Sequence, residues 1–472
     1  FGSRHSAQSA RRRIAARARW PRVLLLGAMA TLGRQLSAFV LVLAAPVAPA
    51  EGAGCTFKFD ASSAPPPATY PSFEDYLAKH GLAFSGPEKA KRERLYTEAV
   101  ESAKAQNAKK GRTWEATVNE LAVKTPEEMQ DYFGLGKALG ARSRDIAPPA
   151  VQNATLPLLH ERDWDWRSHR PSVVTAVKDQ GHCGSCWAFA SAAVLESAIA
   201  IGTGTLFSLS PQQLVSCTPN PNKCGGSGGC SGATAQLAFN YVKTAGIATE
   251  WRYPYTSGVA SADGECFDLN GLRAPAAAIQ GFANVPRNLA EPLLEAVLKS
   301  PVAVSVAANW GLYHRGILDQ DGCGYIVNHA VVLMGYGQQD CVNYWLIRNS
   351  WGATWGEQGY IRLERARAPE HEKCGWDTDP MAGSACETPP DGSNPPTKVW
   401  VCGTCGVLSD SSYPTGPSVG APTAPEDPAV KPAPELAEVS AHDAVGLPDG
   451  SDGAAFLQAP AAPGAAASPE LR

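Results

Sequence analysis

The stretch "KDQGHCGSCWAFASAAVLESA", residues 178–198, decides the fold because it places two cysteines directly before an apolar run. Cys183 and Cys186 are three residues apart, and residues 187–200 carry apolar side chains at helical intervals. Two cysteines at this spacing fit a redox pair, two zinc ligands, or a structural cysteine beside a nucleophile. The rest of the chain decides among these three interpretations.

The first two interpretations have little support elsewhere in the sequence. A redox pair normally lies in a βαβ unit with a tryptophan before its first cysteine, whereas Trp187 follows the second cysteine here. A zinc site needs a second pair of ligands, and Cys402 and Cys405 are the one candidate. A nucleophilic Cys186 at the start of a predicted helix is favoured, because free N–H groups and the helix dipole stabilise a thiolate there.

A nucleophilic cysteine needs a base, and the base needs a group that orients it. His329 lies in "VNHAVVLMGYG", residues 327–337, at the edge of a predicted apolar strand. Asn349, in "RNSWGATWGEQGY", could accept a hydrogen bond from the imidazole and fix its tautomer, and Trp351 could shield that bond from water. Each feature alone has a structural explanation, such as a buried core histidine. Together and in this order they indicate a Cys–His catalytic site.

Three blocks of sequence resemble the signature motifs of papain-like (cathepsin L-type) cysteine proteases. They are "QGHCGSCWAF" at 180–189, "NHAVVLMGYG" at 328–337 and "NSWGATWGEQGYIRL" at 349–363, within a similarity that runs from about Asp163 to Pro414. The resemblance implies an α+β, two-domain papain-like fold. It has a helical left domain, an antiparallel β-barrel-like right domain and an active-site cleft between them, with a helical prosegment before it.

The resemblance also implies the chemistry of the site. Cys186 is the expected nucleophile, His329 the base and acid, Asn349 the orienting residue and Gln180 a donor to the oxyanion. The expected activity is peptide-bond hydrolysis by an endopeptidase through an acyl-enzyme, on protein or peptide substrates and with no metal or organic cofactor. Two other hypotheses stay open here: a catalytically silent binding or inhibitory module, and a cysteine-rich zinc or redox protein.

The thirteen cysteines suggest an oxidising compartment and a disulfide framework. The resemblance implies the pairs Cys183–Cys230 and Cys217–Cys266, and a third bridge from Cys323 to the C-terminal end of the body. Spacing from "GYIRL" favours Cys374 for that bridge, but spacing to "SYP" favours Cys405, which we prefer. The family's C-terminal motif is split here by an insertion between Cys374 and Cys405. The remaining cysteines are expected to hold this insertion by disulfides; they are Cys224, Cys341, Cys374, Cys386 and Cys402. Their odd number leaves one free or paired with Cys55.

The segment before the predicted catalytic body carries the marks of an inhibitory prosegment. Residues 88–110 lack Pro and Gly and predict a helix. Its spaced set resembles the family's prosegment signature, with two departures at Ala99 and Ala103; the set is Glu88, Arg92, Tyr96, Ala99, Ala103 and Asn107. The downstream "WEATVNELAVKTPEEM" strengthens the likeness, with Val123 where the family has an acid. We expect this segment to inhibit its own enzyme and maturation to cut between about 151 and 163.

The chain therefore divides into four predicted parts. Residues 1–50 are a leader and signal peptide, because "LSAFVLVLAAPVAPA" at 36–50 has the length of a signal-peptide core. Residues 51–158 are the propeptide, 159–414 the peptidase domain, and 415–472 a Pro/Ala-rich tail too poor in aromatics to fold. We expect a monomer in the secretory pathway, lysosomal or vacuolar or extracellular, with no stable membrane anchor. The net charge of −4 gives no basis for nucleic-acid binding.

The resemblance places a specificity pocket for the second residue before the scissile bond. Its expected walls are Gly232, Ala233, Thr234, Ala235, Ser305, Val327 and Ala330, with Trp351 along the same cleft and Asp410 at the base. Small walls leave room for a bulky apolar side chain, and the acid could accept arginine. The loop between Cys217 and Cys230 lacks the paired histidines of a carboxydipeptidase, so endopeptidase action is favoured.

Overall fold

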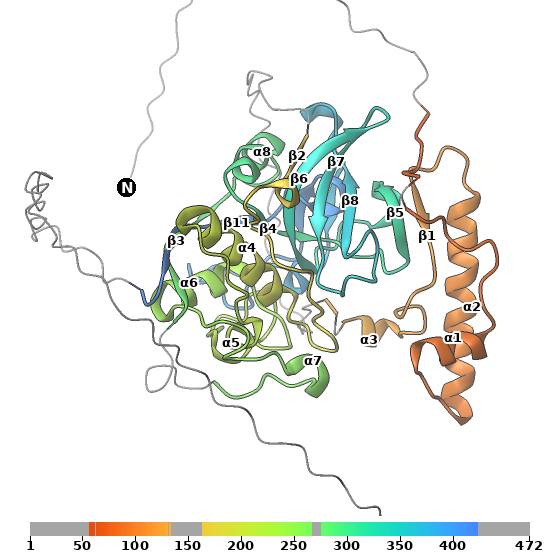
Figure 1. The fold of residues 1–472 in the computed structure, drawn as a ribbon, viewed down its shortest axis with the longest axis horizontal. Helices are drawn as coiled ribbons and strands as arrows, with labels where there is room; N and C mark the ends of the chain where they lie inside the picture. The colour runs from red at the N-terminus through yellow and green to blue at the C-terminus, as the bar shows by residue number, and fades with distance from the viewer. Residues whose placement is uncertain (1–55, 62, 131, 134–162, 267–274, 423–472) are drawn as a thin grey trace, which may run out of the picture. The chain divides into compact units, whose positions relative to one another are not determined.

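The computed structural model in Figure 1 describes residues 56–61, 63–130, 132–133, 163–266 and 275–422. Its central element is α4 (Cys186–Thr203), which forms the helix predicted after the two cysteines. Fifteen of its residues are buried, and Gly204 ends it in the left-handed conformation. Among the described helices, α4 alone is long and apolar enough to cross a membrane, but 83% of that stretch is buried inside the fold. It is a core helix.

The helical domain packs around α4. Its other helices are α5 (Pro211–Cys217), α6 (Ala235–Ala245) and α7 (Ser257–Ala260). Ser210 caps α5 by accepting from the Gln213 N–H, and Thr234 caps α6 by accepting from the Leu237 N–H. Each hydroxyl pairs an N–H that a helix start would otherwise leave without a partner. Buried Leu195 and Phe239 lie in the core that these helices share with the sheet.

A nine-stranded sheet forms the other domain, in the order β1-β5-β8-β7-β6-β4-β11-β3, with β2 paired to β6. Its strands are β1 (Trp114–Ala116), β2 (Trp164–Asp165), β3 (Ala277–Asn284), β4 (Val302–Val306), β5 (Tyr313–Leu318), β6 (His329–Gln339), β7 (Val342–Arg348), β8 (Tyr360–Glu364) and β11 (Ser411–Val419). The strand pairs are antiparallel except β5–β8, and the sheet is not closed. The predicted antiparallel, barrel-like domain is therefore an open, mostly antiparallel sheet in the structure.

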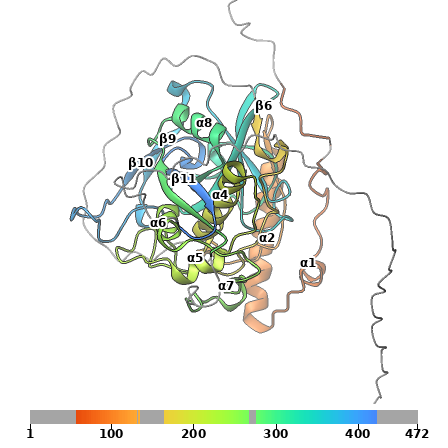
Figure 2. The same ribbon diagram turned by 60° about the vertical axis from the view of Figure 1, so that its left-hand side comes forward.

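The remaining elements lie around this sheet. They are α8 (Ala290–Lys299), the short helices η1 (Trp166–Ser168), η2 (Gln320–Gly322), η3 (Pro369–His371), η4 (Pro380–Ala382) and η5 (Thr404–Gly406), and the separate hairpin β9 (Cys374–Asp377) with β10 (Val399–Cys402). In the view of Figure 2, the β9–β10 hairpin lies on the side away from α1 and α2.

The predicted prosegment has a small apolar core of its own and adds a strand to the sheet. It contains α1 (Phe73–His80), α2 (Gly86–Ala108), β1 and α3 (Pro126–Gln130), so the predicted helix is present. A second apolar core holds it together, with Tyr76, Tyr96 and Val123 buried. Arg92 on α2 bonds to the carboxylates of Glu88 and Glu128. The hydrogen bond from Arg92 lowers the pKa of Glu128 to about 2, although burial opposes the shift.

All three disulfides implied by the resemblance are present: Cys183–Cys230, Cys217–Cys266 and Cys323–Cys405. The insertion is stapled by two more, Cys224–Cys386 and Cys374–Cys402. Cys341 is also disulfide-bonded. The predicted leader, the maturation region 151–162 and Cys55 lie outside the described residues.

One predicted boundary is wrong. Disorder was expected from residue 415, but β11 continues to Val419 and pairs with β3 from Ser412↔Asn284 to Val419↔Ala277. Its prolines are tolerated because β4 pairs only with Ser411 and Ser412, so one edge of the later residues needs no N–H donors. The peptidase domain thus extends beyond Pro414, and residues 423–472 of the predicted tail are not described.

Candidate active site

Cys186 lies at the first turn of α4, where the helix meets the sheet. Ser185 occupies the N-cap position, and the Cys183–Cys230 disulfide fixes the loop immediately before it. Cys186 is the one free cysteine among the described residues and is 2% exposed. Its Sγ accepts a hydrogen bond from the Ala330 N–H, 3.4 Å away, so the thiol lies against the start of β6.

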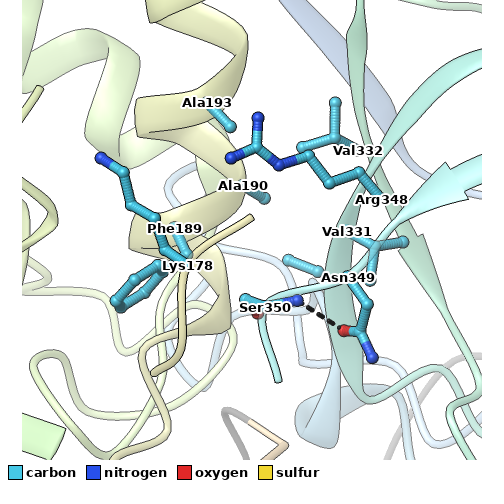
Figure 3. A pocket seen from close by; sticks show the side chains of 10 residues that line it. Lys178, Phe189, Ala190, Ala193, Val331, Val332, Arg348, Asn349 and Ser350 are labelled. Carbon is cyan, nitrogen blue, oxygen red and sulfur yellow. Dashed lines mark hydrogen bonds between the residues drawn. The ribbon is translucent and has the colours of Figure 1, made fainter. Parts of the chain in front are cut away.

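His329 begins β6, beside the thiol, and its tautomer follows from its partners. Its Nε2 lies 2.8 Å from Oδ1 of Asn349. That same oxygen accepts from the Ser350 N–H at 2.8 Å, so it acts as an acceptor and the imidazole must donate (Figure 3). Neutral His329 then carries its proton on Nε2. Buried Nδ1, which has no hydrogen-bond partner among the described residues, keeps a lone pair.

Trp351 covers the His–Asn hydrogen bond. Its ring centroid lies 5.0 Å from that of His329, and it packs edge-on against Trp355 at 5.1 Å. Trp351 is 2% exposed and Asn349 is 3% exposed. A hydrogen bond in such a dry setting is stronger than one in water, so the imidazole orientation is held firmly.

Gln180 presents its side-chain amide from the loop before α4 and is fully buried. The Ser350 hydroxyl donates to its Oε1 at 2.6 Å, which fixes the amide orientation. Its Nε2 donates to the carbonyl of Cys183 at 2.9 Å and to the carbonyl of Tyr132 at 3.0 Å. Tyr132 belongs to the prosegment. The Gln180 amide, the predicted oxyanion donor, is therefore occupied by the backbone carbonyl of Tyr132.

A small cavity of about 20 Å³ lies behind the site, between α4 and strands β6 and β7. Figure 3 shows Ala190 and Ala193 of α4 facing Val331, Val332 and Arg348 across it. This volume is about that of one water molecule. An ion pair of 2.8 Å between Lys178 and the fully buried Glu196 anchors the loop before the site to α4.

Burial controls the protonation of the Cys–His pair in this form. It raises the pKa of the Cys186 thiol to about 11, although backbone N–H groups of Ala330 and Trp187 oppose the shift. It lowers the pKa of His329 to about 4, against the hydrogen bond to Asn349. Desolvation disfavours both charged forms. Burial therefore favours the neutral thiol and the neutral imidazole over the charged thiolate–imidazolium pair while the site is closed.

Two prosegment residues cover the pair. The Phe133 ring lies 6.0 Å from His329 and 6.0 Å from Trp351. The Tyr132 ring lies edge-on at 5.7 Å from His182 and 6.2 Å from Trp351. The prosegment therefore occupies the oxyanion donor through a carbonyl and excludes water from the imidazole through an aromatic ring.

The predicted specificity residues are only partly gathered in one place. Thr234 and Asp410 line a pocket of about 470 Å³, whose other walls include Gln236 and Leu237 of α6. Ser305 donates to one oxygen of Asp410 at 2.8 Å, and Gln236 donates to the other at 2.9 Å. The other predicted wall residues are not among those that line this pocket. Ala233 and Ala235 are buried at and just before the start of α6, and the Gly232 carbonyl accepts from the Gly228 N–H. Ala330 of β6 pairs with Ser305 of β4, and Val327 lines a neighbouring pocket.

The insertion supplies walls that the sequence did not predict. Ser384 and Cys386 line both the Thr234–Asp410 pocket and the neighbouring pocket at Val327. The Ala385 carbonyl accepts from the Gly225 N–H at 2.9 Å, next to the Cys224–Cys386 disulfide. The insertion therefore lies against the predicted specificity region.

The two Cys-x-x-Cys pairs are neither a zinc site nor a redox pair. Cys183, Cys402 and Cys405 each form a disulfide with a distant cysteine. In the part of the chain that the structure describes, no group of His, Cys, Asp and Glu could hold a metal ion. Of the two original cysteines, Cys183 is structural and Cys186 carries the free thiol.

The sequence did not reveal four residues that contribute to the site. Tyr132 and Phe133 follow the recognised "TPEEM" run, but nothing in their own residue types indicates where they lie. Ser350 directly follows Asn349 in the motif "NSWGATWGEQGYIRL", but its hydrogen bond to Gln180 depends on a tertiary contact. Tyr255 lies 75 residues from Gln180 in sequence, and its hydroxyl donates to the Gln180 carbonyl at 2.7 Å.

Known proteins share both the sequence and the fold. Residues 160–384 match the family model described as "Papain family cysteine protease". The chain is 35% identical over 314 residues to Thiol protease SEN102 of Hemerocallis sp., covering 64% of this chain and 82% of that protein. It is also 35% identical over 310 residues to Cysteine endopeptidase Rep1 of Oryza sativa subsp. japonica, covering 64% and 80%.

A solved proform has the same architecture. The structure of digestive procathepsin L 3 from Tenebrio molitor larval midgut matches with a TM-score of 0.54 and 28% identity, over 72% of this chain and 97% of that one. The matched share is longer than residues 163–422, so the match also includes residues outside that range. With a free cysteine, a histidine held by an asparagine and a prosegment over both, the chain belongs to the papain family and is a cysteine endopeptidase made as a zymogen.

Proposed function

We propose that Cys186 is the nucleophile, His329 the general base and acid, Asn349 the orienting residue and Gln180 the oxyanion donor of this endopeptidase. The observation that carries this assignment is the hydrogen bond from Gln180 Nε2 to the Tyr132 carbonyl. Gln180 also donates to the carbonyl of Cys183, three residues before Cys186, which is the one free thiol of the described residues. The prosegment thus occupies the place that a substrate carbonyl would take.

The proposed reaction begins when the prosegment leaves. Water and substrate then reach the pair, the desolvation of Cys186 and His329 falls, and the proton moves from Sγ to the Nδ1 lone pair. The thiolate attacks the scissile carbonyl carbon, and its oxygen takes the negative charge. Gln180 Nε2–H and the Cys186 N–H stabilise that oxygen, and one such donor is worth about 3 kcal/mol of barrier.

The same imidazole then completes the cycle. His329 returns the proton to the leaving amine, which releases the first product and leaves an acyl-enzyme on Cys186. It next takes a proton from water, which hydrolyses the thioester and restores the thiol. Throughout, Asn349 Oδ1 holds the Nε2–H, so the ring does not rotate between the two proton transfers.

The test compares Cys186→Ser with the unchanged chain after an added protease has removed the prosegment. We expect hydrolysis of a Phe-Arg peptide substrate to fall about 10⁵-fold or more, since removing a nucleophile costs this order in related mechanisms. An epoxide that alkylates active-site thiols should label Cys186 alone. Equal rates in both proteins would overturn the assignment and favour a catalytically silent module.

We further propose that the pocket bounded by Thr234, Asp410 and the insertion receives the second residue before the scissile bond. A carboxylate has about four acceptor positions, and the Asp410 oxygens use one each for Ser305 and Gln236. Asp410 can therefore still accept a basic side chain. Gln236 and Ser305 hold the carboxylate in place for that contact.

Peptides that differ only at this position test the pocket. In Asp410→Asn, we expect kcat/KM for arginine at this position to fall about tenfold relative to leucine, because a hydrogen bond between charged groups is worth about 1.5–3 kcal/mol. Glu387→Gln, an exposed acid on the same insertion, is the matched control. An unchanged arginine-to-leucine ratio in Asp410→Asn would exclude the role.

Three features fit a proenzyme of the secretory pathway: the prosegment, the predicted leader, and the five disulfides within the described residues, which need an oxidising compartment. We propose residues 51–158 as the propeptide, maturation between about 151 and 163, and a monomer without a stable membrane anchor, delivered to a lysosome or vacuole or secreted. N-terminal sequencing of the processed enzyme and its sedimentation coefficient test these assignments. A mature N-terminus beyond Asp163 would contradict the cleavage proposal.

A further inference from the structure

Cys341 occupies an unusual place at the tip of the β6–β7 hairpin. Gln339 pairs with Val342, so Asp340 and Cys341 form a two-residue turn, with φ angles of 46° and 67°. Both angles lie in the left-handed region, where such turns favour Asn or Asp followed by Gly. A cysteine stands where glycine would be least strained, and it is disulfide-bonded.

The partner of Cys341 follows from the other cysteines. Five disulfides within the described residues pair ten of the thirteen cysteines, and Cys186 is free. Cys55 is the one cysteine of the sequence that remains. It belongs to the predicted propeptide, whereas Cys341 belongs to the peptidase domain.

The chain just after Cys55 lies against this hairpin. The Lys58 N–H donates to Oδ2 of Asp340 at 2.8 Å, and the Gln339 side-chain amide donates to the Lys58 carbonyl. Three residues of extended chain span at most about 10 Å. Cys55 is therefore within reach of Cys341, whose neighbour Asp340 holds Lys58.

We propose that a Cys55–Cys341 disulfide ties the prosegment to the peptidase domain, so that cutting the chain between 151 and 163 does not free the inhibitor. After such a cut the two fragments are still covalently joined. Rebinding of the prosegment is then intramolecular, at an effective concentration of about millimolar. Full activation requires a second event besides proteolysis, either reduction of this disulfide or destruction of the prosegment.

Reduction requires a dithiol of the thioredoxin or dithiothreitol class. Its first thiolate attacks one sulfur of the Cys55–Cys341 bond and expels the other as a thiolate, which gives a mixed disulfide. Its second thiol then displaces the bound cysteine and closes a disulfide within the reductant. The reductant loses two electrons and two protons, and the two cysteines take them up as thiols.

The first experiment needs no catalysis, so its outcome is independent of the proposed function. The full chain carries Cys186→Ser and a recognition site for a sequence-specific protease inserted after Ala150. After cleavage, the protein is denatured in detergent with iodoacetamide. We expect one band without reductant and two bands with dithiothreitol. Two bands without reductant would overturn the proposal.

Two variants sharpen this result. Cys341→Ser should give two bands without reductant, whereas a Cys374→Ala/Cys402→Ala double variant, which lacks a disulfide within the peptidase part, should still give one. If Cys341→Ser does not fold, mass spectrometry of the parent decides. A peptide pair joining Cys55 and Cys341 supports the proposal, and Cys341 alkylated or joined to another cysteine overturns it.

A dilution assay with Cys186 intact tests the consequence. After the cut, activity per molecule of the parent should not change over a hundredfold dilution, because an attached inhibitor is not diluted. Cys341→Ser should gain activity about tenfold or more over the same range, as its prosegment dissociates. Equal gains in both proteins would show that the prosegment is not attached.

Discussion

Two of the contacts between the prosegment and the enzyme differ greatly in construction. At the active site it uses two neighbouring residues, with one carbonyl on Gln180 and one ring against His329 and Trp351. At the outer edge of the sheet it adds a strand, β1, to β5. There Glu115 is 4% exposed and accepts from Arg315 of β5 at 2.8 Å.

The two contacts have different roles: one attaches the prosegment to the enzyme, and the other blocks the active site. Strand addition and a buried ion pair give the edge its attachment, and neither touches a reacting atom. The contact at the active site is small, but it occupies the oxyanion donor and desolvates the imidazole. A small movement of Tyr132 and Phe133 can therefore expose the site while the edge stays attached. The following predictions test that separation.

Removing the Glu115 carboxylate should have the largest effect on the edge. Burial alone would raise the pKa of Glu115, but bonds from Arg112 and Arg315 outweigh it and lower the pKa. Glu115→Ala leaves Arg315, 8% exposed, without its buried carboxylate, which costs about 3–5 kcal/mol. We expect hydrogen exchange of the β1 and β5 amides to rise accordingly at pH 7.

The matched control is Glu120→Ala, a half-buried acid of the same segment that lies outside the β1–β5 pairing. It should leave β1 and β5 exchange within about threefold of the parent, as surface substitutions usually change stability by under 0.5 kcal/mol. If Glu115→Ala behaves like Glu120→Ala, the edge is held by the strand pairing alone.

Removing the Gln180 amide should break the active site and spare the edge. In Gln180→Ala, processed with an added protease, we expect kcat to fall about 10²–10³-fold from the loss of one oxyanion donor. Exchange at β1 and β5, measured in the unprocessed proenzyme, should not change. Gln212→Ala, another buried glutamine, which bonds to Ser257, is the control for a purely structural loss. A similar fall of kcat in both variants would contradict the assigned role.

Much of the active site could be predicted from the sequence because local pattern and chemistry agree there. An apolar helical run after Cys186 predicts α4, and the helix start places the thiol. The strand edge at His329 and the turn at Asn349 supply groups that only a tertiary contact joins, yet their motifs are specific enough to name them. The three framework disulfides followed from the same resemblance.

What could not be predicted depends on contacts between distant segments. Pro414 and Pro417 favour a loop locally, but β3 pairs with this stretch along one edge. The opposite edge, which β4 leaves unpaired beyond Ser412, needs no N–H donors, so β11 forms. The neutral state of the Cys–His pair follows from burial, to which Phe133 contributes. Neither residue type nor spacing encodes that burial.

Acid should open the active site without loosening the edge. The pKa of His329 is about 4 in the closed form and about 6.5 when the ring is exposed, so the closed form binds fewer protons. Its stability is complete above pH 6.5 and falls as the pH drops toward 4. We expect opening, measured by exchange of the 126–130 amides after correction for the intrinsic rate, to rise about tenfold per pH unit in this window.

The carboxylates of the prosegment change in a lower pH range. The pKa of Glu128 is about 2, and that of Glu115 is also lowered, so their stabilisation is present above 4.5 and is lost only below it. In a Cys186→Ser background, His329→Asn should abolish the rise between pH 6.5 and 4.5. His314→Asn, at the edge, should keep it. His182→Asn measures the contribution of the histidine that faces Tyr132. A rise that survives His329→Asn would assign acid opening to other groups.

Removing the Phe133 ring, which lies against the His329 imidazole, should have the smallest effect of these changes. It tests most directly whether this ring blocks access to the Cys186 thiol. Phe133→Ala removes contacts with His329 and Trp351, and an aromatic contact is worth about 0.5–1.5 kcal/mol. Alkylation of Cys186 by iodoacetamide in the intact proenzyme should therefore speed up about two- to tenfold.

Phe84→Ala is the control, because the Phe84 ring packs within the prosegment under Arg92. If both variants speed alkylation equally, general loosening of the prosegment governs access to the thiol, and the two contact regions are not separate. If only Phe133→Ala does so, one ring keeps the thiol closed while the edge keeps the inhibitor in place.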